Sequence, residues 1–166
     1  MSGPDEEAPF RQRGWPGIRA RLFHSYFLLS RPMTLGVRAL VHDRDAHAVF
    51  LIRHTYVPGW HLPGGGVEVG ETMVESLRRE LDEEGNIELF GPADLRSVHY
   101  NTGSSRRDHV ALYVVTEYRQ REPKKRDREI AEARFFPVGE LPADTTPATR
   151  RRIAEVFGEA AVSAYW

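Results

Sequence analysis

A glycine-rich turn followed by an acidic helix, between Gly64 and Ile87, constrains the fold of this chain more than any other feature. The stretch reads GGGVEVGETMVESLRRELDEEGNI, and its second half has helical periodicity. Because an α-helix advances about 100° per residue, Glu80, Glu83 and Glu84 share one face. A second face, about 90° from the first, is apolar and consists of Met73, Val74, Leu77 and Leu81. We expect this apolar face to pack on a sheet, which leaves the carboxylates at the edge of the core beside a cleft.

The three carboxylates predict a metal site. Like charges three and four residues apart on a helix repel each other by roughly a few tenths of a kcal/mol per pair. Divalent cations between them would remove this repulsion, and ligands that are all oxygen favour Mg²⁺ or Mn²⁺. Without the glycine turn, the same pattern is more typical of a solvated surface helix.

The spacing of the stretch goes beyond an acidic helix. From Gly65, five residues lead to Glu71 and seven more lead to Arg79, which begins the run RELDEEGNI. This pattern resembles the Nudix box, G-x5-E-x7-R-E-U-x-E-E-x-G-U with U aliphatic, the signature of the Nudix hydrolases. The wider resemblance to that family covers about Pro32 to Pro142. Every fixed position matches except the last glycine, where Asn86 stands. Asn is the residue that best replaces glycine in the left-handed conformation that closes a helix.

The resemblance to the Nudix hydrolases implies a fold, a reaction and a set of site residues. The fold is α/β, an α/β/α sandwich with a mixed sheet. The reaction is hydrolysis of the diphosphate linkage in a nucleoside diphosphate linked to another group X, with Mg²⁺ as cofactor and a metal-activated water. The implied catalytic residues are Glu71 and Arg79, which orient the ligands, and the metal-facing Glu80, Glu83 and Glu84, one of which is a candidate general base. The carbonyl of Gly64 or Gly65 is a further candidate ligand.

Residues that contact the rest of the substrate are less well defined. Several arginines are candidates to grip phosphate, although each is also typical of a surface charge: Arg38, Arg53, Arg106 and Arg107. Tyr56 and Trp60 are candidates to stack on a base or ribose, and Trp60 is equally consistent with the core. Glu129 is either a fourth carboxylate of the site or an exposed charge at a strand end. ADP-ribose or a nucleotide sugar is the expected small-molecule partner, and a noncatalytic nucleotide-binding module is the alternative function.

The order of the other predicted elements supports the same fold class. Strands are expected over Thr34–His42, Ala48–His54, Leu95–Asn101, His109–Tyr118 and Glu129–Pro137, and helices over Thr72–Gly85 and Pro147–Ala161. The charged segment Arg119–Arg128, which includes the basic run Lys124–Arg126, is predicted to be a solvated connection. Strands and helices that do not alternate strictly favour a mixed sheet flanked by helices.

The beginning of the chain is predicted to lie outside that sandwich. Residues 1–16 contain three prolines and predict a mobile tail. Helical spacing then predicts an additional helix over Gly17–Ser30, which is a packing helix, a dimerisation arm of a homodimer or a membrane-surface helix. The predicted domains are therefore residues 1–31, with tail and helix, and residues 32–166.

Composition limits the partners and the compartment. A net charge of −1 gives no electrostatic reason for nonspecific nucleic-acid binding. The chain has no cysteine, which excludes disulfides and thiolate metal sites and suits a reducing, cytoplasmic location. The apolar run Leu22–Leu29 is too short to cross a bilayer, so no membrane partner is expected.

Overall fold

The computed structural model describes Tyr26 and residues 32–103 and 105–166. Contacts divide the chain into two units, residues 1–32 and residues 33–166, and the second unit contains every strand and helix given below. The tail and the N-terminal helix predicted before residue 32 lie outside the described residues, apart from Tyr26. Both stay predictions, as does the domain boundary that depends on them.

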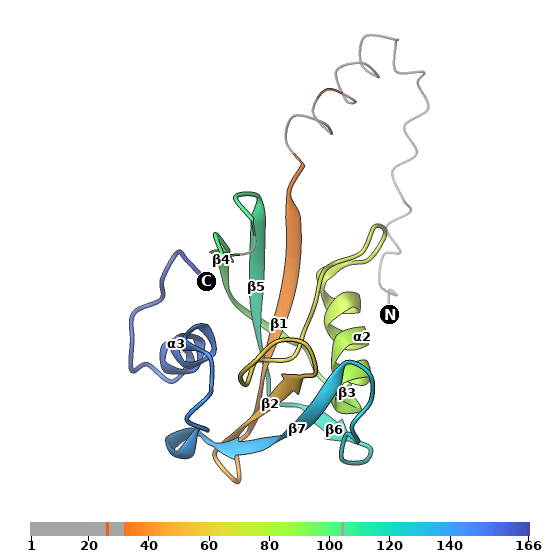
Figure 1. The fold of residues 1–166 in the computed structure, drawn as a ribbon, viewed down its shortest axis with the longest axis vertical. Coiled ribbons are helices and arrows are strands. Elements are labelled where there is room, and N and C mark those ends of the chain that lie inside the picture. Colours follow the sequence, from red (N-terminus) through yellow and green to blue (C-terminus); the bar gives the residue numbers. More distant parts are fainter. Residues whose placement is uncertain (1–25, 27–31, 104) are drawn as a thin grey trace, which may run out of the picture. The chain divides into compact units, whose positions relative to one another are not determined.

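The centre of the second unit is a five-stranded mixed sheet with the order β4-β5-β1-β2-β7 (Figure 1). β1 and β5 are parallel, whereas the other neighbouring strands are antiparallel. The bounds of these strands are β1 Thr34–Asp43, β2 Ala48–His54, β4 Asp94–Tyr100, β5 Asp108–Val115 and β7 Ile130–Pro137. β3 (Ile87–Leu89) and β6 (Tyr118–Gln120) form a separate antiparallel pair.

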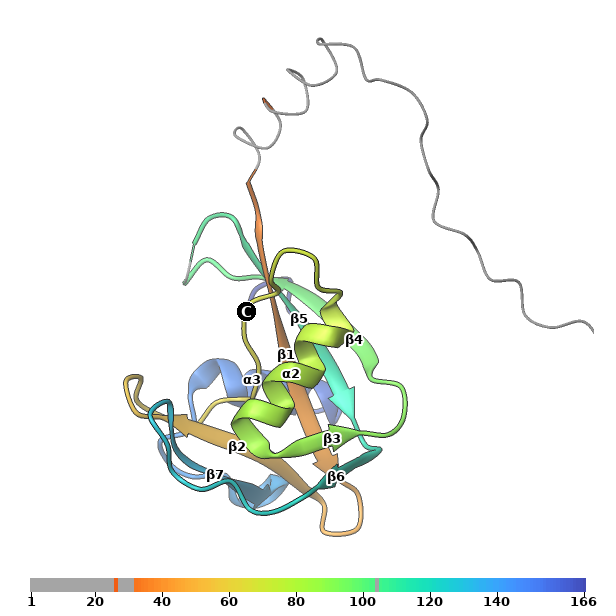
Figure 2. The same ribbon diagram turned by 90° about the vertical axis from the view of Figure 1, so that its right-hand side faces the viewer.

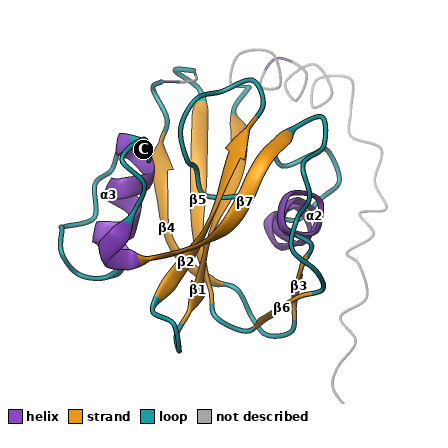
Figure 3. Ribbon diagram, turned by 60° about the horizontal axis from the view of Figure 1, so that its bottom comes forward, coloured by secondary structure: helices purple, strands orange, loops and turns teal. Residues whose placement is uncertain are grey.

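Two helices cover opposite faces of the sheet. α2 (Met73–Gly85) lies across the strands and leads directly into β3 (Figure 2). α3 (Pro147–Val156) follows a short 3₁₀ helix, Val138–Glu140, and packs on the other face (Figure 3). This arrangement confirms the predicted α/β/α sandwich. Within the described residues, no helix is long and apolar enough to cross a membrane.

Alternation along β1 divides the core into two layers. Val37, Ala39 and Val41 pack toward α2 together with Leu77 and Leu81, whereas Leu40 packs toward α3. The layer under α3 also contains Val49, Leu51, Trp60, Leu62, Leu112, Phe136 and Ile153. Because successive strand residues point to opposite faces, a single strand serves both layers. The predicted alternation and the predicted apolar face of α2 are confirmed, with Met73 and Val74 partly buried at its start.

The ends of α2 are fixed by side chains. The Thr72 hydroxyl accepts a hydrogen bond from the Glu75 N–H, and the Glu75 carboxylate accepts one from the Thr72 N–H, which together form a capping box. Asn86 ends the helix with φ 53° and ψ 34°, and its N–H donates to the Asp82 carbonyl. The left-handed conformation expected at Asn86 is therefore confirmed.

Some predicted boundaries differ from the structure. The strand expected to run to Tyr118 ends at Val115, and Tyr118 instead begins β6, within a segment predicted to be a plain connection. β3 and β6 have three residues each, which is too short for a recognisable strand pattern in the sequence. An ion pair between Arg119 and Glu88 connects the two strands. The last helix ends at Val156 and not at Ala161, since Gly158 takes φ +80°.

Candidate active site

The glycine loop lies directly beside β1. The N–H groups of Val37 and Ala39 donate to the carbonyls of Gly65 and Pro63, both at 2.9 Å, and the Val67 N–H donates to the Leu35 carbonyl at 2.8 Å. Since β2 pairs with β1 only at residues 42–43, residues 63–67 take the place of a neighbouring strand along the first half of β1. Sheet-like hydrogen bonds to β1 thus fix the position of the loop.

Two glycines of this loop lie in close approach to other parts of the chain. Gly64 has φ +137°, and a Cβ there would lie 2.1 Å from the Val37 carbonyl oxygen. A Cβ at Gly65 would lie 2.2 Å from Oε1 of Glu80. Gly64 therefore cannot be replaced without moving β1, whereas at Gly65 the backbone of the loop lies against the flexible end of the Glu80 side chain.

Arg79 connects the loop to the acidic face of α2. Its guanidinium donates two hydrogen bonds to Glu71, at 2.9 and 3.2 Å, and one to the Gly66 carbonyl at 3.2 Å. Nη1 also donates to Glu80 at 2.7 Å and to Glu83 at 3.4 Å. These bonds raise the pKa of Arg79 and lower the pKa of Glu71, because each stabilises the charged form of its partner. Arg79 thus contacts Glu71, Glu80 and Glu83 together.

Glu84 is the most deeply placed of the three helix carboxylates. The residue is 7% exposed, and its Oε2 accepts a hydrogen bond from the Gly64 N–H at 2.7 Å. Its other oxygen lies 3.9 Å from Nε2 of His54. Burial raises the pKa of Glu84 to about 7, with the negative charges of Glu80 and Glu129 acting in the same direction. The His54 pKa is lowered, chiefly by burial and next by Arg38, so this contact is not an ion pair at neutral pH.

The donor set fits a hard divalent cation. All three side chains offer carboxylate oxygens, and Glu84 is desolvated with a raised pKa, which a bound cation would offset. Within residues 32–103 and 105–166, no three acidic or histidine side chains converge on one point. The reason is that Arg79 draws Glu80 and Glu83 toward itself while Glu84 turns to Gly64. Arg79 engages Oε1 of Glu80 and Oε2 of Glu83, so the other oxygen of each carboxylate could contact a cation while Arg79 stays in place.

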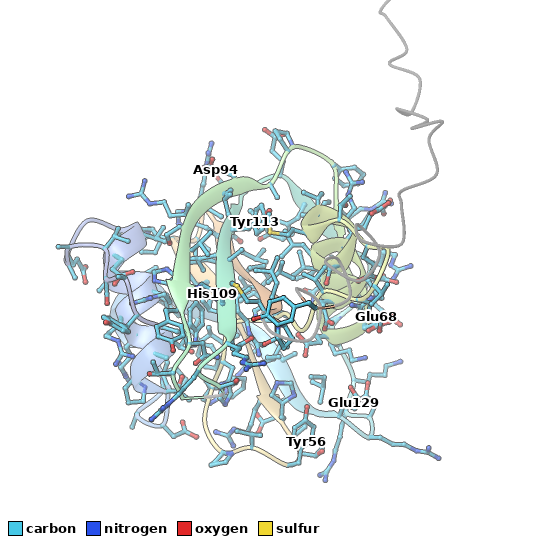
Figure 4. All side chains as sticks on the ribbon, turned by 90° about the horizontal axis from the view of Figure 1, so that it is seen from above. Tyr56, Glu68, Asp94, His109, Tyr113 and Glu129 are labelled. Atoms are coloured by element: carbon cyan, nitrogen blue, oxygen red, sulfur yellow. The ribbon has the colours of Figure 1, made fainter. Side chains whose placement is uncertain are left out.

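Glu129 lies on the same side of the molecule as the helix carboxylates. It lines a cavity of about 550 Å³ together with Glu83, Glu84, Lys124, Asp127 and Arg128. Its carbonyl accepts a hydrogen bond from the Thr55 N–H at 2.9 Å, which attaches the segment before β7 to the end of β2. Figure 4 accordingly shows Glu129 and Tyr56 on the same side of the molecule. This position is compatible with a fourth carboxylate, although Glu129 precedes β7 and does not lie within it.

Three of the other residues predicted to contact substrate make contacts within the fold. Arg38 donates to the Leu62 carbonyl at 3.0 Å and is close enough to Glu84 to lower its pKa. Arg53 is engaged by Glu132 at 3.3 Å and Asp144 at 2.6 Å, and it lies over the ring of Trp60. Trp60 is 1% exposed and belongs to the core.

Tyr56 and the two loop arginines remain exposed. Tyr56 is 68% exposed, with its ring 5.1 Å from that of His54, so it is free to contact a ligand near the end of β2. Arg106 and Arg107 are exposed in the loop between β4 and β5 and do not line the Glu129 cavity. The structure therefore brings together the residues of the box, Arg38 and Glu129, and it does not join Arg106 and Arg107 to them.

Two residues near the carboxylates were missed by the sequence analysis. His54 ends β2, and strand alternation from Arg53 could have placed it on the α2 side of the sheet. Lys124, predicted to be part of a solvated run, has a side chain only 14% exposed. Its ammonium donates to the Glu83 carbonyl and contacts Asp127, both at 2.6 Å, and no local sequence pattern predicts this.

Comparison with known proteins agrees with this geometry. The family model described as NUDIX domain matches residues 32–157, so the chain belongs to the NUDIX domain family. The chain is 34% identical over 121 residues to "Putative mutator protein MutT4" of Mycobacterium tuberculosis, covering 70% of this chain and 49% of the relative. It is 37% identical over 83 residues to the mouse "8-oxo-dGDP phosphatase NUDT18", covering 50% of this chain and 25% of the relative. The matches thus span half or less of these relatives.

Among solved structures, the fold is similar to the MutT NUDIX hydrolase from Burkholderia pseudomallei. The TM-score is 0.64 at 26% sequence identity, and the similar region covers 74% of this chain and 97% of the other. The similar region therefore corresponds to nearly the whole of that protein.

Proposed function

We propose that this chain is a Mg²⁺-dependent hydrolase that cleaves the diphosphate linkage of a nucleoside diphosphate derivative. The observation that carries the proposal is Glu84, a buried carboxylate with a pKa raised to about 7, bonded to the glycine loop beside Glu80. A carboxylate buried without a cation of its own is suited to a bound cation. Family membership supports the same reaction class.

The residues of the chain have distinct proposed roles. Glu80, Glu83 and Glu84 would hold the cation, and the Gly64 or Gly65 carbonyl would complete its ligands. Bound Mg²⁺ or Mn²⁺ neutralises diphosphate charge and lowers the pKa of a water molecule. Arg79, held by Glu71 through two hydrogen bonds, fixes the directions of Glu80 and Glu83. Glu129 lies at the wall of the same cavity, where a carboxylate can accept a proton from water.

The substrate is proposed only as a class. The name of one relative points to 8-oxo-dGDP, whereas ADP-ribose or a nucleotide sugar is the substrate expected from the resemblance to the family. Both groups contain a nucleoside diphosphate, which is the part that the carboxylate site would bind. A cytoplasmic location and a homodimer stay predictions.

A hydrolysis screen that separates substrate from products by anion-exchange chromatography tests the proposal, because ADP-ribose and nucleotide sugars yield two phosphate monoesters and no free phosphate. The panel contains 8-oxo-dGDP, ADP-ribose and several nucleotide sugars, each assayed with Mg²⁺ and with excess EDTA. We expect turnover that EDTA abolishes, and a fall in kcat of about 10²–10⁴-fold in Glu84→Gln. Glu83→Gln should also reduce kcat. Glu159→Gln, on the exposed segment after α3, is the matched control for the loss of one negative charge and should retain activity.

The same screen separates the enzyme from the noncatalytic alternative. A nucleotide-binding module would show ligand-dependent thermal stabilisation with no turnover of any compound in the panel. Wild-type turnover in Glu84→Gln, or turnover that persists in EDTA, would contradict the proposed site, because the variant lacks the buried ligand and the chelated enzyme lacks the cation.

A further inference from the structure

A buried charged cluster on the α3 side of the sheet holds the end of the chain. Arg152 and His99 are fully buried and Glu155 is 3% exposed. Nη1 of Arg152 donates to the Tyr165 carbonyl at 3.0 Å, and Nη2 donates to Glu155 at 2.6 Å. Burying these charged groups costs free energy of desolvation. The hydrogen bonds that the cluster makes therefore indicate which part of the chain it stabilises.

The contacts of this cluster converge on residues 163–166. Glu155 accepts a hydrogen bond from the Ser163 N–H at 3.0 Å, and His99 Nδ1 lies 2.8 Å from the Ser163 carbonyl. The backbone of the segment also pairs with Tyr100, through the Tyr100 N–H to Ala164 at 2.9 Å and the Trp166 N–H to Tyr100 at 3.1 Å. Residues 163–166 are thus fixed by buried charges and by an added strand-like pairing.

This fixation places Trp166 in the wall of a cavity next to the glycine loop. The cavity has a volume of about 270 Å³, and its lining includes Trp166, Arg38, Gly65, Asn101 and Asp108. The Trp166 ring is partly buried, at 5.6 Å from the His99 ring and 5.4 Å from the Arg152 guanidinium carbon. An aromatic side chain of the chain's last segment therefore borders the loop that carries the carboxylate site.

The cavity and the carboxylate site share two residues. Gly65 lines the cavity and is also the position where a Cβ would strike Glu80. Arg38 lines the cavity and is close enough to Glu84 to lower its pKa. A molecule with its diphosphate at the carboxylates could extend past Arg38 into this cavity.

The polar part of the lining is suited to a planar, hydrogen-bonding group. Asp108 accepts hydrogen bonds from Thr34 and from the amide nitrogen of Asn101, both at 2.7 Å. The side-chain carbonyl of Asn101 accepts no hydrogen bond from the residues that the structure describes. Aromatic rings beside a fixed polar edge are the usual combination for binding a nucleobase.

We propose that Trp166 is a specificity-determining residue that stacks on the nucleobase of the substrate, and that Arg152, Glu155 and His99 are positioning residues for it. This inference rests on the proposed function, because it takes the substrate to be a nucleoside diphosphate. The base binds in the 270 Å³ cavity while the diphosphate binds at the carboxylates.

Binding without turnover tests the role of Trp166. The probes are AMP, GMP, CMP and UMP, with ribose 5-phosphate as the matched ligand that lacks a base, all titrated by calorimetry with Mg²⁺. None contains a diphosphate, so the result does not depend on hydrolysis. We expect the best nucleotide to bind more tightly than ribose 5-phosphate. Trp166→Ala should weaken the nucleotide by about tenfold or more and leave ribose 5-phosphate within about twofold.

Two further variants guard against a folding defect. Trp166→Phe keeps an aromatic ring and should retain nucleotide binding within about threefold, while losing the quenching of tryptophan fluorescence by bound nucleotide. Tyr165→Ala removes the neighbouring ring, which is 59% exposed and does not line the cavity, and should change neither affinity. Equal affinity of wild type and Trp166→Ala for the nucleotide, or an equal loss for ribose 5-phosphate, would overturn the inference.

The positioning role has its own readout. The double variant Arg152→Met, Glu155→Leu removes both buried charges together, which tends to preserve stability. It should weaken nucleotide binding about as much as Trp166→Ala, with little further loss when the two changes are combined. No product from any compound in the hydrolysis screen, with intact, Trp166-dependent nucleotide binding, would reject the hydrolase and keep this inference. Hydrolysis of a panel compound, with nucleotide binding that Trp166→Ala does not change, would keep the hydrolase and reject this inference.

Discussion

Two buried glutamates on opposite faces of the sheet meet different surroundings. Glu155 on α3 is 3% exposed and is paired with the Arg152 guanidinium at 2.6 Å, although one of its oxygens makes no hydrogen bond. Glu84 on α2 is 7% exposed and accepts a backbone hydrogen bond, but within the described part of the chain it forms no ion pair with a lysine or arginine. The first carboxylate is compensated by an ion pair inside the fold, whereas the second is compensated only in part, by the Gly64 N–H and the nearby charge of Arg38.

The difference separates a structural charge from a functional one. Burying a carboxylate is unfavourable unless a cation or several donors accompany it. On α3 the chain supplies that cation itself, and the pair holds residues 163–166 in place. On α2 the pKa of Glu84 is raised to about 7, which leaves the compensation to a proton or to a bound metal.

The largest effect is expected from breaking the compensated pair. Arg152→Ala leaves the Glu155 charge buried without a partner, so we expect the free energy of unfolding to fall by about 3–5 kcal/mol. Urea unfolding followed by circular dichroism measures this change. Arg121→Ala, which breaks the exposed Arg121–Asp82 pair, is the control and should cost about 1 kcal/mol or less. Similar losses in the two variants would contradict the contrast drawn between buried and exposed pairs.

A second prediction concerns the pH dependence of stability without metal. The folded-state pKa of Glu84, about 7, lies above its ordinary value of 4.5, so the folded chain binds more protons than the unfolded chain between these values. Its contribution to stability is therefore present below about pH 4.5 and is lost as the pH rises through 7. Glu84→Gln should remove this loss, which is on the order of 3 kcal/mol.

Thermal unfolding in EDTA from about pH 4.5 to about pH 8 measures the effect. The melting temperature of Glu84→Gln should approach or exceed that of wild type at the upper end of the range. Glu83→Gln, at a side chain that is 60% exposed, is the control for losing one negative charge. Melting temperatures of wild type and Glu84→Gln that change in parallel with pH would show that the pKa of Glu84 is not raised in the folded chain.

A smaller effect is expected where the glycine loop meets Glu80. Gly65→Ala introduces a Cβ 2.2 Å from the end of the Glu80 side chain, which can move away at little cost in stability. Displacing this carboxylate should lower kcat/KM by about tenfold or more with little change in melting temperature. Gly66→Ala is the matched control, because a Cβ there meets no atom within 4 Å. Equal activities of the two variants would show that the contact between Gly65 and Glu80 does not affect activity.

The smallest effect concerns the end of α2. Asn86→Ala places an alanine in the left-handed conformation, at φ 53°, and should destabilise the fold by roughly 1–2 kcal/mol. Asn86→Gly suits this conformation but loses the weak hydrogen bond to Glu122, so we expect a change within about 0.5 kcal/mol. Urea unfolding of the three proteins gives the order. An alanine variant as stable as wild type would contradict a left-handed cap.

Much of the fold could be predicted because its signals are local. Alternation along residues 34–42 fixed both faces of β1, and the helical period fixed the apolar face of α2. The left-handed Asn86 also follows from residue type, whereas Thr72, expected as the first residue of the helix, is its N-cap. By contrast, β3 and β6 were missed, because a three-residue strand has too few residues to show alternation. They form through contacts with each other, including the Arg119–Glu88 ion pair.

The sequence by itself determined the family, the sandwich and the carboxylates of α2, because the spacing of glycines, apolar residues and acids along one segment specifies them. Only the tertiary structure decided which of these groups is buried and what compensates it. Glu84 and Glu155 are chemically identical in the sequence. One of them meets Arg152 and the other meets a backbone N–H, because burial and ion pairing depend on contacts between segments far apart in the chain.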